Sequence, residues 1–340
     1  LEPVALALSH KAGDPVKMVM SREEVFRASG PTSGAHIWVK MGAKKDGTIT
    51  AAECELKYQA GAFQGSPVQP GAMCAFAPYD IKNVHVVGYD VVTNRPKVAA
   101  YRAPGAPISE YGVECVIDEI ATKIGMDPLG MREHNAARQG TKAAYGPTFG
   151  PIGFADTLEA AKSHPHYSAP LGKNQGRGVA SGFWFNIGGD STASDHINED
   201  GTASVMEGNP DIGGSRASMA LMAAEVLGID YEKIRVTIGD TSSVGYNFLT
   251  GGSRVTFASG KAVVEAAKGA VAELCNRAAK IWEIDPDAVE WVDGEARPAG
   301  DNAGKFDPLP LSTLAGMAGK TGGPIGGHAS LNVKGAGPGF

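Results

Sequence analysis

The chain has 340 residues, of which 46 are glycine, and its 31 basic and 37 acidic side chains give a formal net charge of −6. Hydrophobic residues make up 43% of the sequence, which predicts a folded core and excludes a disordered chain. The acidic balance, with no run of five like charges, argues against nucleic-acid or membrane-surface binding. No apolar stretch of about 18 residues is present, so no membrane span is expected.

The first half of the chain shows patterns of both helices and strands. We expect helices over 1–12, from Ser21, over 108–124, from Asp127, and up to about Ser163. We expect strands over 16–20, 36–41, 48–58 and 84–92, and a loop over 59–78. The clearest element is 108–124, where apolar residues recur at helical spacing until Gly125 ends the helix. Glu24, three residues after Ser21, completes a capping box.

Residues 164–176 are polar, rich in proline and glycine and without periodicity, which places a module boundary there. In the second module we expect strands over 177–185, 194–198, 203–206 and 234–238. Helices are expected over 215–227 and from about Ser253 to Ile281, followed by a glycine-rich tail. The fold class is therefore α+β in two mixed modules.

The four cysteines are spaced unlike the ligands of a zinc or iron–sulfur site. They are Cys54, Cys74, Cys115 and Cys275. We expect buried free thiols in a reducing compartment, and hence a cytoplasmic protein. No cluster of metal-ligating side chains is expected elsewhere.

Two segments share the pattern Gly-Gly-Ser-Arg at a predicted helix start. The first contains Gly213, Gly214 and Ser215; the second, 38 residues later, contains Gly251, Gly252, Ser253 and Arg254. Glycine lets backbone amides approach an anion, and a helix N-terminus offers free N–H donors. The pair therefore predicts a cradle for a phosphorylated or heterocyclic ligand. The alternative is ordinary helix capping that occurs twice by chance.

A third segment joins the 84–92 strand to the 108–124 helix and contains Tyr101, Arg102 and Ala103, followed by Pro104 and Gly105. Proline restricts the backbone on both sides of it, and such a loop holds a side chain rigidly at the mouth of a site. Arg102 is therefore a candidate site residue. The alternative is a structural arginine that binds carbonyl groups.

Four stretches resemble the large, molybdenum-binding subunit of the xanthine dehydrogenase and aldehyde oxidase family. The start, LEPVALALSHKAGDPVKMVMSREE, is similar to the segment after that family's GGFGGK loop, and VAAYRAPGAP resembles its active-site loop. EGNPDIGGSRASMALMAAEVLGIDYEKIRVTIGDT and TGGSRVTFASGKAVVEAA resemble two cofactor-binding turns with their helices. The resemblance covers essentially the whole chain. It implies the C-terminal part of a first molybdenum cofactor-binding domain over 1–166 and the N-terminal part of a second over 167–340.

The resemblance also implies a function. It assigns Arg102, with Tyr101 and Ala103, to the active-site loop beside the molybdenum, and both glycine turns to the molybdopterin cofactor, in its plain or cytosine dinucleotide form. Relatives are oxidoreductases that hydroxylate an aldehyde or N-heterocycle with water. Electrons leave through iron–sulfur clusters and FAD, which we expect on partner subunits of an oligomeric complex.

Some positions depart from the family pattern. Gly214 replaces a common glutamine, and Ala103 with Pro104 stands where xanthine-type enzymes have Gly-Phe and carbon monoxide enzymes have cysteine. Purine and carbon monoxide substrates are therefore disfavoured, while the small-molecule substrate itself stays open. The general base of relatives falls beyond Phe340 and the GGFGGK loop falls before Leu1. We therefore expect a fragment that is inactive alone; the alternatives are a noncatalytic paralogue that keeps the fold and an anion site, and an unrelated phosphate-binding enzyme.

Overall fold

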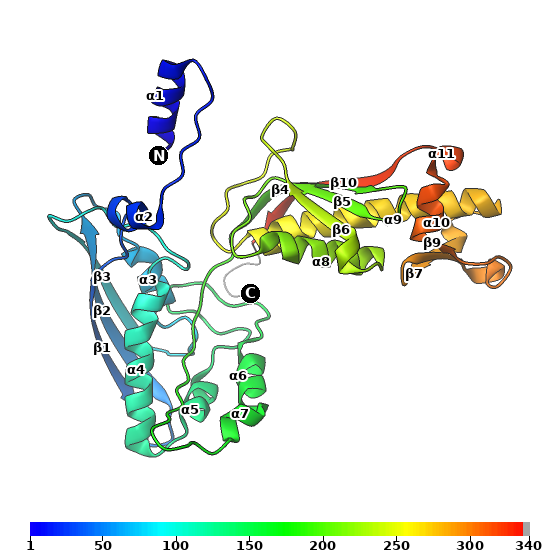
Figure 1. Ribbon diagram of the computed structural model, residues 1–340. Helices are drawn as coiled ribbons and strands as arrows, with labels where there is room; N and C mark the ends of the chain where they lie inside the picture. Colours follow the sequence, from blue (N-terminus) through cyan, green and yellow to red (C-terminus); the bar gives the residue numbers. More distant parts are fainter. Residues whose placement is uncertain (336–340) are drawn as a thin grey trace. The chain divides into compact units, whose positions relative to one another are not determined.

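The structure is a computed structural model that describes residues 1–335. It divides into two compact units, Leu1–Trp184 and Phe185–Phe340. Figure 1 shows the elements of both. The division into cofactor-binding domains at residues 166 and 167 stays a prediction. Among residues 1–335, no helix is both long enough and apolar enough to cross a bilayer.

The first unit packs helices on one face of a three-stranded sheet. The strands are β1 (Ala35–Ala43), β2 (Ile49–Gly61) and β3 (Val84–Val92), in that order, with β1 antiparallel and β3 parallel to β2. The helices are α1 (Glu2–Ala12), α2 (Arg22–Ala28), α3 (Val68–Cys74), α4 (Ala106–Ile124), α5 (Pro128–Asn135), α6 (Phe154–Ser163) and α7 (Pro165–Ser168). Fully buried Leu56 and Tyr58 of β2 meet Val113 and Ile117 of α4 in the core.

The helix signals in the sequence are confirmed. Ser21 and Glu24 form both bonds of the capping box at the start of α2. Gly125 ends α4 in the left-handed region at φ 70°, which glycine adopts without a Cβ clash. The Asp127 side chain accepts a hydrogen bond from the amide of Gly130 at 2.7 Å and so caps α5.

Three expectations for residues 1–185 were wrong. Residues 16–20 form no strand, because an alternating pattern needs a neighbouring strand to pair with and β1–β3 do not lie beside them. The expected loop over 59–78 contains α3, where tertiary packing overrides the poor helix propensity of its proline and glycine. Residues 177–185 are not a strand either, since the amides of Ser181 and Phe183 donate instead to carboxylates of α4, each at 2.7 Å.

The second unit is a four-stranded sheet with two helices on one face and a small three-stranded sheet beyond. The main sheet has the order β10 (Ile325–Lys334), β4 (Gly188–Ile197), β5 (Ala203–Glu207) and β6 (Ile234–Ile238). The smaller sheet contains β7 (Val289–Val292), β8 (Glu295–Pro298) and β9 (Leu309–Pro310). The helices are α8 (Ser215–Leu227), α9 (Gly260–Trp282), α10 (Leu311–Gly316) and α11 (Ala318–Thr321), with a π-helical turn, η2, over Val255–Ser259.

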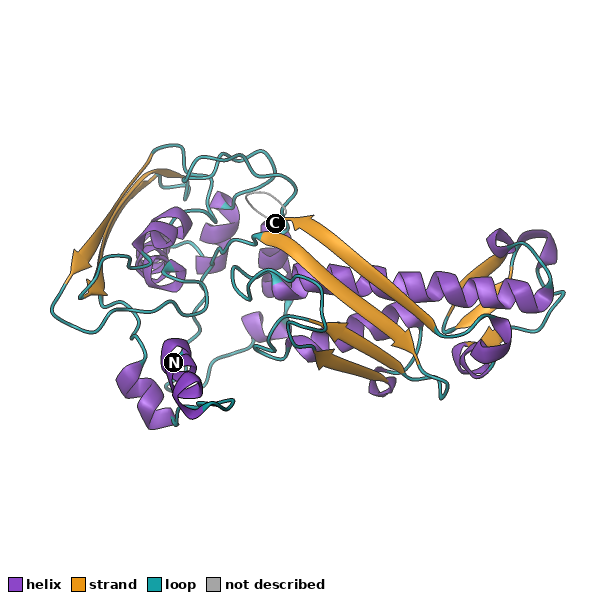
Figure 2. Cartoon of the chain, turned by 90° about the horizontal axis from the view of Figure 1, so that it is seen from above, coloured by secondary structure: helices purple, strands orange, loops and turns teal. Residues whose placement is uncertain are grey.

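Small residues let α9 approach the main sheet closely; in Figure 2 the sheet lies in front of this helix. Ala262, Ala266 and Ala270 of α9 are fully buried. A Cβ atom at Gly327 of β10 would lie 1.9 Å from the Ala266 carbonyl oxygen, so only glycine fits there. Part of the glycine excess is therefore explained by helix-on-sheet packing.

The predicted bounds of α8 and β6 are confirmed, and the β4–β5 hairpin forms as expected. The long helix was predicted to begin near Ser253, but α9 begins at Gly260 after the π-helical turn. Strand β10 lies within the glycine-rich tail, where we predicted no element. Glycine lowers the strand signal of a sequence, and here α9 needs that glycine, so the sequence pattern alone could not reveal the strand.

Candidate functional site

Sheet topology brings the two Gly-Gly-Ser turns to one edge of the second unit. Strands β5 and β6 are adjacent and parallel, so the loops that follow them leave the sheet at the same edge. The first loop leads through Gly213 into α8, and the second leads through Gly251 into η2 and α9 (Figure 1). Antiparallel β4 begins at this edge with Gly188. Such an edge, at the carboxyl ends of parallel strands, is the usual position of ligand sites in open sheets.

The first turn exposes its backbone. Gly213 and Gly214 have φ of 71° and 84°, and a Cβ atom on either would meet no heavy atom within 4 Å. Within residues 1–335 their amides donate no hydrogen bond. Asp211 accepts from the Ser215 hydroxyl at 3.2 Å and from Arg216 Nε at 2.8 Å. The hydrogen bond from Arg216 lowers the pKa of the Asp211 carboxyl. Hydrogen bonds to Asp211 of the same loop thus hold the turn, and its outer side is open.

The second turn carries backbone strain. Gly252 has φ of 63° and Ser253, which has a side chain, has φ of 57°. A non-glycine residue in the left-handed region is uncommon, and such strain concentrates at ligand sites. The π-helical turn η2 follows directly. Single π turns inside helices also occur frequently at functional sites.

Arg254 is fully buried, and its guanidinium holds the second turn from within. Its nitrogens donate to five oxygens with these distances: Gly188 O and Asp190 O at 2.6 Å, Phe248 O at 2.8 Å, Leu249 O at 3.3 Å and Asn209 Oδ1 at 3.4 Å. A further hydrogen bond goes to the Ser191 hydroxyl. Burial lowers the pKa of the guanidinium. Because these donors already bind the protein, Arg254 ties the start of β4 to the second loop; its contact with a ligand stays a prediction.

Sequence inspection missed Glu207, the last residue of β5. The side chain is 1% exposed, Oε2 accepts from the Asn209 amide at 2.7 Å, and within residues 1–335 Oε1 has no hydrogen-bond partner. Burial raises the pKa of this carboxyl. The signal was available, because strand alternation places Glu207 on the buried face with Ala203 and Val205.

The Arg102 loop belongs to the first unit, and contacts of Gly105 with Tyr58 and Pro67 fix its position. Tyr58 donates its hydroxyl proton to the Gly105 carbonyl at 2.9 Å, and a Cβ atom at Gly105 would lie 2.0 Å from the Pro67 carbonyl oxygen. Ala103 has φ of 55°, a strained value for a residue with a side chain. Tyr101 and Arg102 are exposed. A rigid, strained backbone therefore presents these two side chains at the surface of the unit.

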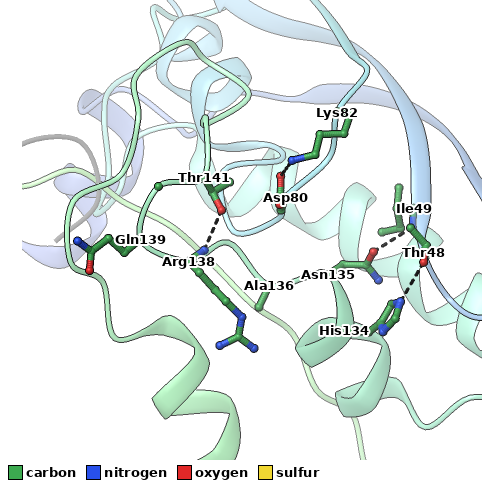
Figure 3. A pocket seen from close by; sticks show the side chains of 11 residues that line it. Thr48, Ile49, Asp80, Lys82, His134, Asn135, Ala136, Arg138, Gln139 and Thr141 are labelled. Carbon is green, nitrogen blue, oxygen red and sulfur yellow. Dashed lines mark hydrogen bonds and ion pairs between the residues drawn. The ribbon is translucent and has the colours of Figure 1, made fainter.

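A pocket of about 610 Å³ lies at the C-terminal end of α5 in the first unit (Figure 3). Its ionisable side chains are Asp80, Lys82, His134 and Arg138. The Lys82 ammonium lies 2.8 Å from an Asp80 oxygen, and His134 Nε2 lies 3.0 Å from the Thr48 hydroxyl. No site residue predicted from the sequence lines this pocket, so it is separate from the Arg102 loop.

The part of the chain that the structure describes has no cluster of side chains that could bind a metal ion. No three His, Cys, Asp or Glu residues gather there in an arrangement that could hold an ion. The four cysteines are free; Cys54 and Cys74 are buried, and burial raises the pKa of the Cys54 thiol to about 12. Cys275 is half-buried and Cys115 is exposed, so the expectation of buried thiols was wrong for Cys115.

Comparisons with known proteins match both units. Residues 1–136 and 155–335 each match a family described as a molybdopterin cofactor-binding domain. The chain is 30% identical to the aldehyde oxidoreductase of Megalodesulfovibrio gigas over 77% of its own length and 31% of that protein. It is 31% identical to a putative xanthine dehydrogenase molybdenum-binding subunit, XdhA, of Escherichia coli K12 over 69% of its length and 34% of that protein.

A solved structure of a Cu,Mo carbon monoxide dehydrogenase shares the fold. The TM-score is 0.76 at 21% identity, with 97% of this chain and 46% of that chain covered. This likeness extends over both units. The chain spans about a third of the length of the relatives named above.

Proposed function

The chain belongs to the molybdopterin cofactor-binding family of xanthine dehydrogenases and aldehyde oxidoreductases, and from this membership we propose that it forms the molybdopterin-binding part of a hydroxylating oxidoreductase. The substrate class is an aldehyde or an N-heterocycle, and the oxygen donor is water. The observation that carries the proposal is the pair of glycine turns at one sheet edge, the first of which is open on its outer side.

The residues present fit such a cofactor. At Gly213 and Gly214 the space that a Cβ atom would occupy is empty. Their amides donate no hydrogen bond to the rest of the described chain. Anionic groups bind readily to free amides at a helix N-terminus, and both turns lead into helices. Gly251, Gly252 and Ser253 supply the second set of contacts, and Arg254 stabilises that turn from within.

The bound cofactor would supply the redox chemistry of the hydroxylation. The chain's own residues bind and orient. Arg102 is the candidate to orient the substrate, because its loop is rigid and its side chain is exposed, and Tyr101 and Ala103 belong to the same loop. The long-range charge of a guanidinium suits a carbonyl or ring nitrogen that gains negative charge during reaction.

Several finer assignments belong to the same proposal. The cofactor is molybdopterin, with the cytosine dinucleotide form as one option, and the partners are an iron–sulfur subunit and an FAD subunit in an oligomeric complex. Residues 1–166 are assigned to the first cofactor-binding domain and 167–340 to the second. Four free cysteines support a reducing, cytoplasmic location.

The decisive experiment measures molybdenum and pterin in the protein as isolated with its co-purifying chains. We expect about one molybdenum per chain, and product that carries ¹⁸O when the reaction runs in labelled water. Arg102→Ala should lower kcat/KM by at least about tenfold while molybdenum content stays the same.

Arg138→Ala is the matched control, since Arg138 is also exposed and lies in the same unit. It should leave kcat/KM unchanged. Protein with no molybdenum in any preparation would overturn the proposal and favour the noncatalytic alternative.

A further inference from the structure

The side chain of Asn209 joins the two glycine loops. Asn209 lies in the loop between β5 and α8 and is 2% exposed. Its Nδ2 donates to the Phe248 carbonyl at 2.8 Å and to the Thr250 hydroxyl at 3.2 Å, both in the second loop. Its Oδ1 accepts from the Ser259 hydroxyl at 2.6 Å and from Arg254 at 3.4 Å. One amide from the first loop thus contacts the second loop before, within and after its turn.

The side-chain carboxamide of Asn209 has no unused hydrogen-bonding group. Both donors and both acceptor positions of the carboxamide are used, and Glu207 fixes the backbone by accepting the Asn209 N–H at 2.7 Å. Asparagine is often found where the backbone is left-handed, but Asn209 is not among the residues with positive φ. The side-chain hydrogen bonds, and not the backbone conformation, therefore account for asparagine here.

We propose that Asn209 is a positioning residue that holds the two glycine turns at a fixed separation, so that both contact the cofactor together. The inference rests on the proposed function, since it explains how the two halves of the cofactor site keep their separation. Each turn alone offers only a few amides, and binding is strong only when both sets are already in place. Without the link, the loops would move independently and the cofactor would leave faster.

Asn209→Ala and its matched control Asn198→Ala test the link. Asn198 also donates through Nδ2, to the Thr202 and Ser204 hydroxyls at 2.9 and 3.2 Å, but in the β4–β5 hairpin at the opposite end of these strands. In the enzyme as isolated, Asn209→Ala should lose molybdenum on dialysis about tenfold faster than wild type. Asn198→Ala should lose it within about twofold of the wild-type rate, although both variants lose side-chain hydrogen bonds.

Hydrogen exchange gives a readout that needs no activity. In Asn209→Ala, the hydrogen-bonded amides of residues 211–218 and 248–258, among them Ala217 and Phe248, should exchange faster in both segments, whereas in Asn198→Ala neither segment should change. Asn209→Asp keeps the acceptors for Ser259 and Arg254, and so should recover part of the lost molybdenum retention. If Asn209→Ala fails to fold, Thr250→Val removes a single contact and should still speed exchange in both segments.

Faster exchange in only one of the two segments, or retention equal to that of Asn198→Ala, would overturn the role of Asn209. Wild-type protein that holds no molybdenum would instead contradict the proposed function. The exchange measurement would then still decide whether Asn209 links the two loops, so the two failures are distinguishable.

Discussion

The two glycine turns have nearly the same sequence and different surroundings. Each has two glycines, a serine and an arginine before a helix. In the first, the Arg216 side chain is 56% exposed and pairs with Asp211 of the same loop. In the second, Arg254 is fully buried and binds the start of β4 and its own loop. The same four-residue pattern therefore produces a surface ion pair in one place and a structural cross-link in the other.

The difference follows from what lies behind each turn. The second turn follows β6, whose loop crosses the start of β4, where backbone carbonyls need donors. The first turn follows β5, which lies between β4 and β6. There the side-chain amide of Asn209 already donates to the Phe248 carbonyl. An arginine becomes buried when a set of unpaired carbonyls surrounds it, and stays at the surface when none does.

The largest effect is expected for Arg254→Ala. Removal of the guanidinium takes one donor each from the carbonyls of Gly188, Asp190 and Phe248 and leaves a cavity at a fully buried position, so the free energy of unfolding should fall by at least about 3 kcal/mol. Urea denaturation followed by circular dichroism measures it. An unfolding midpoint equal to that of Arg216→Ala would contradict the contrast between the two turns.

Asp195→Asn, a stabilising change in the same sheet, tests whether molybdenum content depends on the global stability of the protein or on the turns themselves. Asp195 of β4 is fully buried, neither carboxyl oxygen has a partner within residues 1–335, and burial raises its pKa to about 7. An unfolded aspartate titrates near pH ~4, so wild-type protein should lose stability between pH ~4 and ~7. Asp195→Asn should raise the free energy of unfolding by about 1–3 kcal/mol at pH 8 and change it little at pH 4.

That variant should leave molybdenum content as in wild type, because Asp195 pairs with Val205 and Gly327 and lies away from both glycine turns in sequence. A stability gain at pH 8 that is equally large at pH 4 would show that ionisation of Asp195 is not its cause.

Alanine at a left-handed glycine in each turn compares their backbones. Gly214→Ala meets no neighbouring atom, so only the conformational cost of about 1 kcal/mol is expected. Gly252→Ala also brings a Cβ atom to 2.5 Å from Ile187 Cδ1, which must shift, so its cost should be somewhat larger. Thermal denaturation measures both. Equal costs would mean that Ile187 moves freely.

The smallest effect is expected for Arg216→Ala. Its ion pair with Asp211 is largely solvated, and such pairs stabilise proteins by less than about 1 kcal/mol. The unfolding free energy should change by less than about 0.5 kcal/mol, in low salt and in 0.5 M salt alike. A loss comparable to that of Arg254→Ala would remove the distinction between the turns.

Local elements that depend on near neighbours could be predicted from the sequence. Helical periodicity and capping residues predicted α4 with its end at Gly125, and α8 with its full bounds. The β4–β5 hairpin and β6 were also predicted from alternation and turn residues. The resemblance to molybdenum-binding subunits was readable from the same segments, and the family is confirmed.

Elements and roles that depend on distant partners could be recognised only in the folded chain. Strand β10 forms by pairing with β4, with glycine at position 327 where α9 packs, and α3 packs with Gly71 against the Gly105 carbonyl. Arg254 and Arg216 look alike in sequence, yet one is buried by carbonyls that come from residues 64 and 66 positions earlier. Asn209 gives no local signal at all, because its hydrogen bonds reach 39 to 50 residues along the chain. Sequence patterns record neighbours a few residues apart, whereas the link between the two glycine turns is made across the sheet.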